Sequence, residues 1–134
     1  MSRAARNVIA LVGRTLLSLI FLMSGAGKIL EWSGTVTQMS NHGVPAPSLL
    51  LAGALVLELG GAVLVILGWK TRWGAAALIA FLVPVTLVFH NFWAFDGDAC
   101  RAQLINFLKN AALAGGLLLI LAHGPGPISV DREP

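Results

Sequence analysis

Four long apolar stretches constrain this chain more than any other feature of its sequence. They run over residues 8–29, 49–67, 73–92 and 104–122. Each has about the 20 residues that an α-helix needs to cross a bilayer core about 30 Å thick. The stretches are rich in leucine, alanine and glycine and lack the alternation of a strand, and only helices or closed barrels satisfy their backbone in lipid. We therefore predict one all-α domain over 1–134, an integral membrane four-helix bundle.

The composition agrees with a membrane protein. Hydrophobic residues make up 57% of the 134 residues, 15 glycines add to them, and only 11% are charged. Soluble domains have about 45–50% apolar residues including glycine and about 25% charged residues. The basic residues are scattered along the chain, which argues against a nucleic-acid partner. The single cysteine, Cys100, excludes an intramolecular disulfide and a CxxC motif.

The basic residues predict how the bundle is oriented. Most of them fall on the segments that share one side of the membrane, namely Arg3, Arg6, Lys70, Arg72 and Arg132. The other side has Arg101, with Lys28 at the end of its helix. The positive-inside rule then predicts two cytoplasmic termini, a periplasmic loop over 30–48 and a short cytoplasmic tail over 124–134 that is solvated from Asp131 onward. Within the loop, the spacing of Trp32, Val36 and Met39 predicts a short helix lying on the membrane.

Polar side chains inside the spans are the candidate functional residues. An ionisable group there costs about 2.5–3.5 kcal/mol, so it normally faces the bundle and has a partner. In the first span, steps of four and three place one narrow stripe on the helix, formed by Arg14, Ser18, Phe21, Gly25 and Lys28. Glu58 lies at the middle of the second span. From the depths of the two residues we expect a buried Arg14–Glu58 ion pair.

A second polar group is expected near the external face. Its members are Lys28, Thr86, His90, Asn91, Asn106, Lys109 and Asn110. Together they would form a polar cup that opens outward, with the Arg14–Glu58 pair as its floor. Such a cup would bind a polar headgroup, a quinone ring or a protein partner. The plainer interpretations are that the ion pair fixes helix register, that the lysines extend to the headgroups, and that the asparagines bridge helices.

Several motifs are absent from the sequence. It contains no histidine pair spaced to ligate haem, no phosphate-binding glycine loop and no Ser-His-Asp arrangement. We therefore predict no metal or nucleotide site and assign no catalytic residue. Any redox chemistry would need a quinone or a partner subunit to supply the cofactor.

The order of short motifs resembles the DoxX family of small bacterial membrane proteins. With Arg14, the motifs are SGAGK (24–28), GVPAP (43–47), ELGG (58–61), GWKTR (68–72), FHNFW (89–93), NFLKN (106–110) and GPGPISVD (124–131). The resemblance covers nearly the whole chain and implies a multi-pass, four-helix bundle in the bacterial inner membrane. The family takes its name from a subunit of an archaeal thiosulfate:quinone oxidoreductase, so the resemblance also implies membrane oxidoreductase complexes as partners.

Three functional hypotheses follow. The first is a quinone-associated subunit of a membrane oxidoreductase system, in which His90 and Lys28 hydrogen-bond the quinone oxygens and Glu58 relays a proton. The second is a non-enzymatic membrane anchor or assembly subunit of a larger complex, favoured by the lack of any internal cofactor motif. The third is a small transporter, for which four helices are few unless the chain forms a homo-oligomer.

Overall fold

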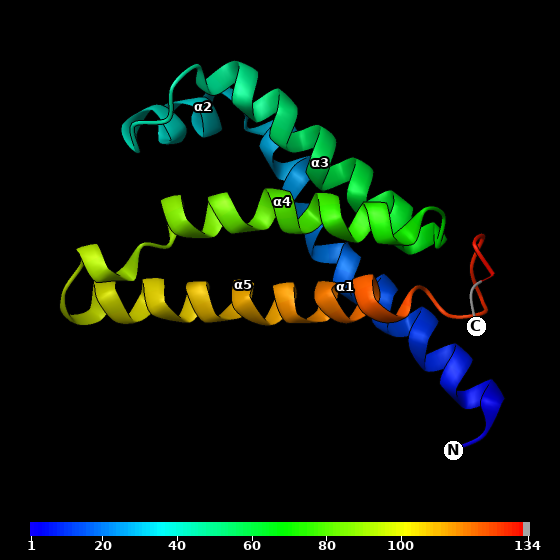
Figure 1. The fold of residues 1–134 in the computed structure, drawn as a ribbon. Helices are drawn as coiled ribbons and strands as arrows, with labels where there is room; N and C mark the ends of the chain where they lie inside the picture. Colours follow the sequence, from blue (N-terminus) through cyan, green and yellow to red (C-terminus); the bar gives the residue numbers. More distant parts are fainter. Residues whose placement is uncertain (133–134) are drawn as a thin grey trace.

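The computed structural model describes residues 1–132, and within that range the regular structure is all helical (Figure 1). The elements are α1 (Arg3–Leu30), α2 (Trp32–Asn41), α3 (Pro47–Leu67), α4 (Thr71–Phe89), the short 3-10 helix η1 (Phe92–Ala94) and α5 (Gly97–His123). Helices α1, α3, α4 continued by η1, and α5 are each long and apolar enough to cross a membrane. The predicted all-α fold with four spanning helices is confirmed.

The helices differ from the predicted spans at their ends. Helix α1 begins at Arg3, because the Ser2 hydroxyl accepts a hydrogen bond from the backbone N–H of Ala5 at 3.1 Å and caps the first turn. Helix α5 begins at Gly97 and so contains polar first turns. Helix α4 ends at Phe89, which places the following polar residues in the connection to η1.

Helix α3 is central to the packing. It contacts α1 on one side and α4 on the other, and α4 in turn contacts α5, whereas α5 touches α1 only slightly. Figure 1 shows α4 and α5 side by side and α1 crossing them obliquely. The buried residues of α1 are Arg14, Ser18, Phe21 and Gly25. The stripe predicted from helical spacing is therefore the face that α1 turns toward the rest of the bundle.

Helices α3 and α4 approach most closely beside the short turn that joins them. A Cβ atom at Gly61 would lie 2.9 Å from the backbone oxygen of Gly74, so the two helices meet where neither has a side chain. By contrast, a Cβ atom at the preceding residue, Gly60, would have no described atom within 4 Å. Away from the turn the two helices diverge (Figure 1). This divergence leaves room between their far halves.

Both termini and the α3–α4 turn lie at one end of the bundle, which we call the proximal end (Figure 1). The connections on either side of α2 and the one between α4 and α5 lie at the other, distal end. All the basic residues assigned to the cytoplasm belong to the proximal segments. That the proximal end faces the cytoplasm stays a prediction.

The loop expected over 30–48 contains α2, as the spacing of its apolar residues predicts. Met39 of α2 is buried in a small cluster with Leu51 and Leu55 of α3, and Val36 packs against that cluster. Trp32 is partly exposed. The apolar face of α2 thus packs at least partly on protein, at the distal end of the bundle.

Candidate functional site

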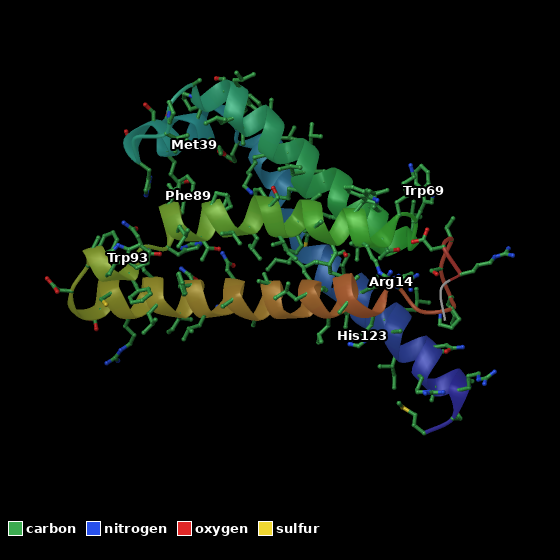
Figure 2. The ribbon with its side chains drawn as sticks, viewed as in Figure 1. Arg14, Met39, Trp69, Phe89, Trp93 and His123 are labelled. Carbon is green, nitrogen blue, oxygen red and sulfur yellow. The ribbon has the colours of Figure 1, made fainter. Side chains whose placement is uncertain are left out.

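The predicted Arg14–Glu58 pair is wrong, because Arg14 binds backbone carbonyls near the proximal end (Figure 2). Its Nε donates to Ile66 O at 3.3 Å, and its two terminal nitrogens donate to Pro125 O at 2.7 Å and Ile128 O at 2.5 Å. Glu58 lies more than two helical turns before Ile66, or about 12 Å along the axis of α3. The last carbonyls of a helix and those of an irregular tail lack helical partners, and a guanidinium has five donors to offer them.

The tail beyond α5 folds back onto the α3–α4 turn. Val130 N donates to Leu67 O at 3.2 Å, and Asp131 N donates to Gly68 O at 2.7 Å. Gly68 has φ +67° and therefore closes α3 in the left-handed conformation, and a Cβ atom there would collide with Ser129. Residues 125–131, which we call the tail segment, thus complete the capping of α3 together with Arg14.

Asp131 caps α4 from the same tail segment. Its carboxylate accepts hydrogen bonds from Lys70 N at 2.8 Å, Thr71 N at 2.9 Å and Thr71 Oγ1 at 2.7 Å. These hydrogen bonds hold the pKa of Asp131 below its ordinary value, and the bond from the Thr71 backbone N–H has the largest effect. Asp131 stays partly exposed at the end of the bundle, and it also serves as the helix cap that Lys70 cannot supply.

Glu58 forms its ion pair with Lys28 instead. Lys28 Nζ lies 2.7 Å from Glu58 Oε2, and the two side chains are 24% and 1% exposed. Lys28 Nζ also lies over the ring of Phe81, 4.5 Å from its centroid, in a cation–π contact. The second carboxylate oxygen, Glu58 Oε1, is buried and has no hydrogen-bond partner among residues 1–132. A buried polar atom without a partner is rare and points to a missing donor.

The ion pair borders a cavity of about 300 Å³ in the distal half of the bundle. Most of the lining is apolar, with Phe81 and Phe89 supplying aromatic rings. The polar part of the lining comes from α1, α2, α3, the α4–η1 connection and α5, and comprises Ser24, Lys28, Thr35, Gln38, Glu58, His90 and Asn110. We call this space the polar cavity.

The polar cavity contains part of the predicted cup. Lys28, His90 and Asn110 are brought together there, with Glu58 as a wall residue. Thr86 lies behind Asn110 and is bonded to it at 3.0 Å. The other predicted members do not line the cavity in the described structure, namely Asn91, Asn106 and Lys109. Asn91 follows the end of α4, and Lys109 is exposed because adjacent helical residues point about 100° apart.

Four polar residues near the cavity escape the sequence reasoning. Gln103 bonds the His90 ring, with Nδ1 and Oε1 2.9 Å apart. Thr35 and Gln38 of α2 line the cavity, although a surface helix would turn its polar face to water. Ser24 of α1 lines it as well. The spacing of Thr35 and Gln38, three residues apart beside the buried Met39, is the one signal that would have revealed them.

Hydrogen bonding fixes which atoms around the cavity can accept. The Thr86 hydroxyl donates to Leu82 O at 2.7 Å, so its oxygen accepts from Asn110 Nδ2 and leaves Asn110 Oδ1 as an acceptor. In a neutral His90 ring, the bond to Gln103 Oε1 makes Nδ1 the donor and leaves Nε2 as an acceptor. With Glu58 Oε1, three lining residues each retain an acceptor atom. Residues 1–132 contain no group of three or more histidine, cysteine or carboxylate side chains that could hold a metal ion.

Comparison with known proteins finds two bacterial inner membrane proteins of matching length and part of a longer protein. It is 40% identical to the inner membrane protein YphA of Escherichia coli, over 97% of this chain and 93% of that protein. It is 33% identical to the inner membrane protein YqjF of the same bacterium, over 94% of this chain and 92% of that protein. A Surfeit locus protein 4 homolog of Drosophila melanogaster is 27% identical over 96% of this chain, which covers 42% of that protein.

The four spanning helices and the two bacterial relatives assign the chain to the inner membrane as a multi-pass protein. No solved structure matches it. The family model named DoxX matches residues 9–91, which include most of α1 and all of α2, α3 and α4, with the Lys28–Glu58 pair. The chain therefore belongs to the DoxX family.

Proposed function

We propose that this protein is a quinone-binding subunit of a membrane oxidoreductase system and that the quinone head occupies the polar cavity. The observation that carries the proposal is Glu58, a buried carboxylate with one oxygen bonded to Lys28 and the other without a donor. Leaving such an oxygen unpaired is costly, so a ligand that donates to it would be favoured. The cavity of about 300 Å³ lies at the lower end of the range for small-molecule sites, about 300–1,000 Å³.

The polar atoms of the cavity fit the two oxygens of a quinone head. Lys28 is a donor for a carbonyl oxygen, whereas Glu58 Oε1, His90 Nε2 and Asn110 Oδ1 are acceptors for hydroxyl groups. Ser24 and Gln38 also line the cavity and can each donate or accept, so the groups that only accept outnumber the one that only donates, and the reduced, hydroxyl-bearing head is the better ligand. A bound quinone would supply two-electron, two-proton redox chemistry. The chain itself binds and orients the head, and Glu58 can take up a hydroxyl proton while Lys28 remains beside it.

Quinone binding can be measured on the purified protein. Protein isolated in mild detergent should retain quinone, and it should bind a water-soluble quinone analogue more tightly in the reduced form. The substitutions His90→Ala and Glu58→Gln should each weaken binding by about tenfold or more, the effect of one lost hydrogen bond to a charged or buried group. His123→Ala is the matched control, since His123 ends α5 at the proximal end. Wild-type protein without quinone and without affinity for the analogue would refute the proposal.

A membrane assembly subunit is the second candidate function, and it is supported by the exposure of α5. Within this helix, Leu117 is the one fully buried residue, and Ile105, Leu108 and Leu119 are exposed. A partner helix would cover such a face as well as lipid does. Co-purification of a second protein in stoichiometric amount would favour this function, whereas isolation of the chain as a homo-oligomer alone would count against it.

A further inference from the structure

A second, larger cavity lies between the diverging halves of α3 and α4. Its volume is about 590 Å³, and its lining is almost entirely apolar. On α3 it extends along Leu50, Gly53 and Leu57, and on α4 it includes Pro84. Leu50 and Leu57, which line it, are exposed, so the cavity is open at its side. In a membrane, this apolar cavity opens toward the lipid.

The polar and apolar cavities share one wall. Its side chains come from α2, α3 and α4 and are Met39, Ala54, Phe81, Val85 and Phe89, all of which line both spaces. Figure 2 shows Met39 and Phe89 near each other at the distal end, between α2 and α4. Phe81 links the two cavities most directly, because its ring also makes the cation–π contact with the Lys28 ammonium group. Four of the five wall residues, all except Ala54, have side chains that can change rotamer without moving a helix.

We propose that one amphiphilic ligand occupies both cavities, with its polar head at the Lys28–Glu58 pair and its isoprenoid chain in the apolar cavity. The proposal rests on the proposed function, and it adds where the chain of the ligand lies and that the ligand enters from lipid between α3 and α4. The shared wall supports it, since only these five residues separate a head bound at Lys28 and Glu58 from the apolar cavity. The division of lining chemistry matches that of an isoprenoid quinone.

Gly53 offers a direct test. A Cβ atom at Gly53 meets no described atom within 4 Å, so Gly53→Leu places a side chain into the apolar cavity without striking the backbone. Gly60→Leu is the matched control, because Gly60 is on the same helix, is equally open and lines neither cavity. Both variants are titrated with the reduced forms of a quinone without a side chain and of a quinone with a decyl chain.

Wild-type protein should bind the decyl quinone more tightly than the chainless quinone. Gly53→Leu should weaken decyl quinone binding by about fivefold or more, in line with the usual effect of overpacking, and leave the chainless quinone unaffected. Gly60→Leu should change neither affinity. The same decyl affinity in Gly53→Leu and wild type, or an equal loss for both ligands, would overturn this proposal while quinone binding stands.

Two further outcomes are informative. Failure of both quinones to bind wild-type protein would remove the proposed function itself. Phospholipid that co-purifies with the wild type and is lost from Gly53→Leu, with no effect of the decyl chain, would assign the apolar cavity to a lipid acyl chain and overturn the inference.

Discussion

Replacing Arg14 by methionine should release the tail segment from the α3–α4 turn. The substitution keeps an apolar stem in the core but removes the donors to Ile66 O, Pro125 O and Ile128 O. Hydrogen bonds from a charged group contribute about 1.5–3 kcal/mol each. The bond to Ile66 is long, and the freed tail carbonyls can bind water at the membrane surface. We therefore expect a net loss of about 3 kcal/mol in the free energy that holds the tail segment.

Amide hydrogen exchange measures this loss locally. The N–H groups of Val130 and Asp131 are bonded to Leu67 O and Gly68 O in the folded protein, so they exchange only when the tail segment opens. A loss of about 3 kcal/mol raises their exchange rates about a hundredfold, since each 1.4 kcal/mol is a factor of ten. The amides in the middle of α3 and α4 should exchange much as in the wild type.

Arg6→Met is the control, because Arg6 is exposed and its side chain makes no hydrogen bond to the tail segment. It should leave the exchange of both amides unchanged. If Arg14→Met leaves Val130 and Asp131 as protected as Arg6→Met does, the guanidinium is not what holds the tail segment. The reasoning from the three carbonyls would then be wrong.

Three more predictions concern stability. Lys28→Met should lower the free energy of unfolding in detergent by about 3 kcal/mol, because it leaves the buried Glu58 carboxylate without its counter-ion. Adding Glu58→Leu should restore most of this free energy. Equal instability of the single and double variants would contradict this coupling. Gly61→Ala should lower the thermal midpoint through a loss of about 1–3 kcal/mol, since its Cβ would press on the α4 backbone, whereas Gly60→Ala should be neutral or slightly stabilising. The pKa of Asp131 is lower in the folded protein than in the unfolded chain. Its contribution to the protection of the tail amides is therefore complete at a pH above the ordinary carboxyl pKa, and it is lost as the pH falls through the folded pKa. Asp131→Asn should abolish this acid dependence of amide exchange.

The bundle is largely predictable because periodicity and length are strong signals in lipid. Steps of four and three predict the buried face of α1, and the structure buries Arg14, Ser18, Phe21 and Gly25. Likewise, the spacing within 30–48 predicts a short helix, which is α2. Glu58 is also identified correctly as a buried group in need of a partner. These inferences use only the position of a residue along its own helix.

Partners between elements are harder to predict. Arg14 binds backbone carbonyls, which every residue carries, so nothing in the sequence marks Pro125 or Ile128 as acceptors. The depth argument also assumes that spans begin at one level, whereas α1 extends back to Arg3 and its Arg14 lies beside the last turn of α3. This offset moves Arg14 out of reach of Glu58.

The polar cup fails in part for a similar reason. Convergence at one depth does not show which helix face turns inward, and Lys109 faces outward although Asn110 lines the cavity. Both cavities depend on the divergence of α3 and α4 away from Gly61, which is a property of helix packing. Gln103 can be recognised as a partner of His90 only when the position of the connection after α4 is known, because that connection brings the two side chains together.

The separation of the two polar sites along the bundle divides their roles. Arg14 and the tail segment complete the backbone hydrogen bonds of the proximal end, where α3 and α4 are closest and the turn needs caps. Lys28 lies in the distal half and Glu58 at the middle of α3, one turn before the close approach at Gly61, and there the carboxylate keeps an unpaired oxygen beside a cavity. A site whose hydrogen bonds are all internal gains nothing from a ligand, whereas one with an unpaired buried oxygen is stabilised by a donor. Bound ligand should therefore raise the thermal stability of the wild type, and it should do so equally in Arg14→Met, because the tail segment touches neither cavity.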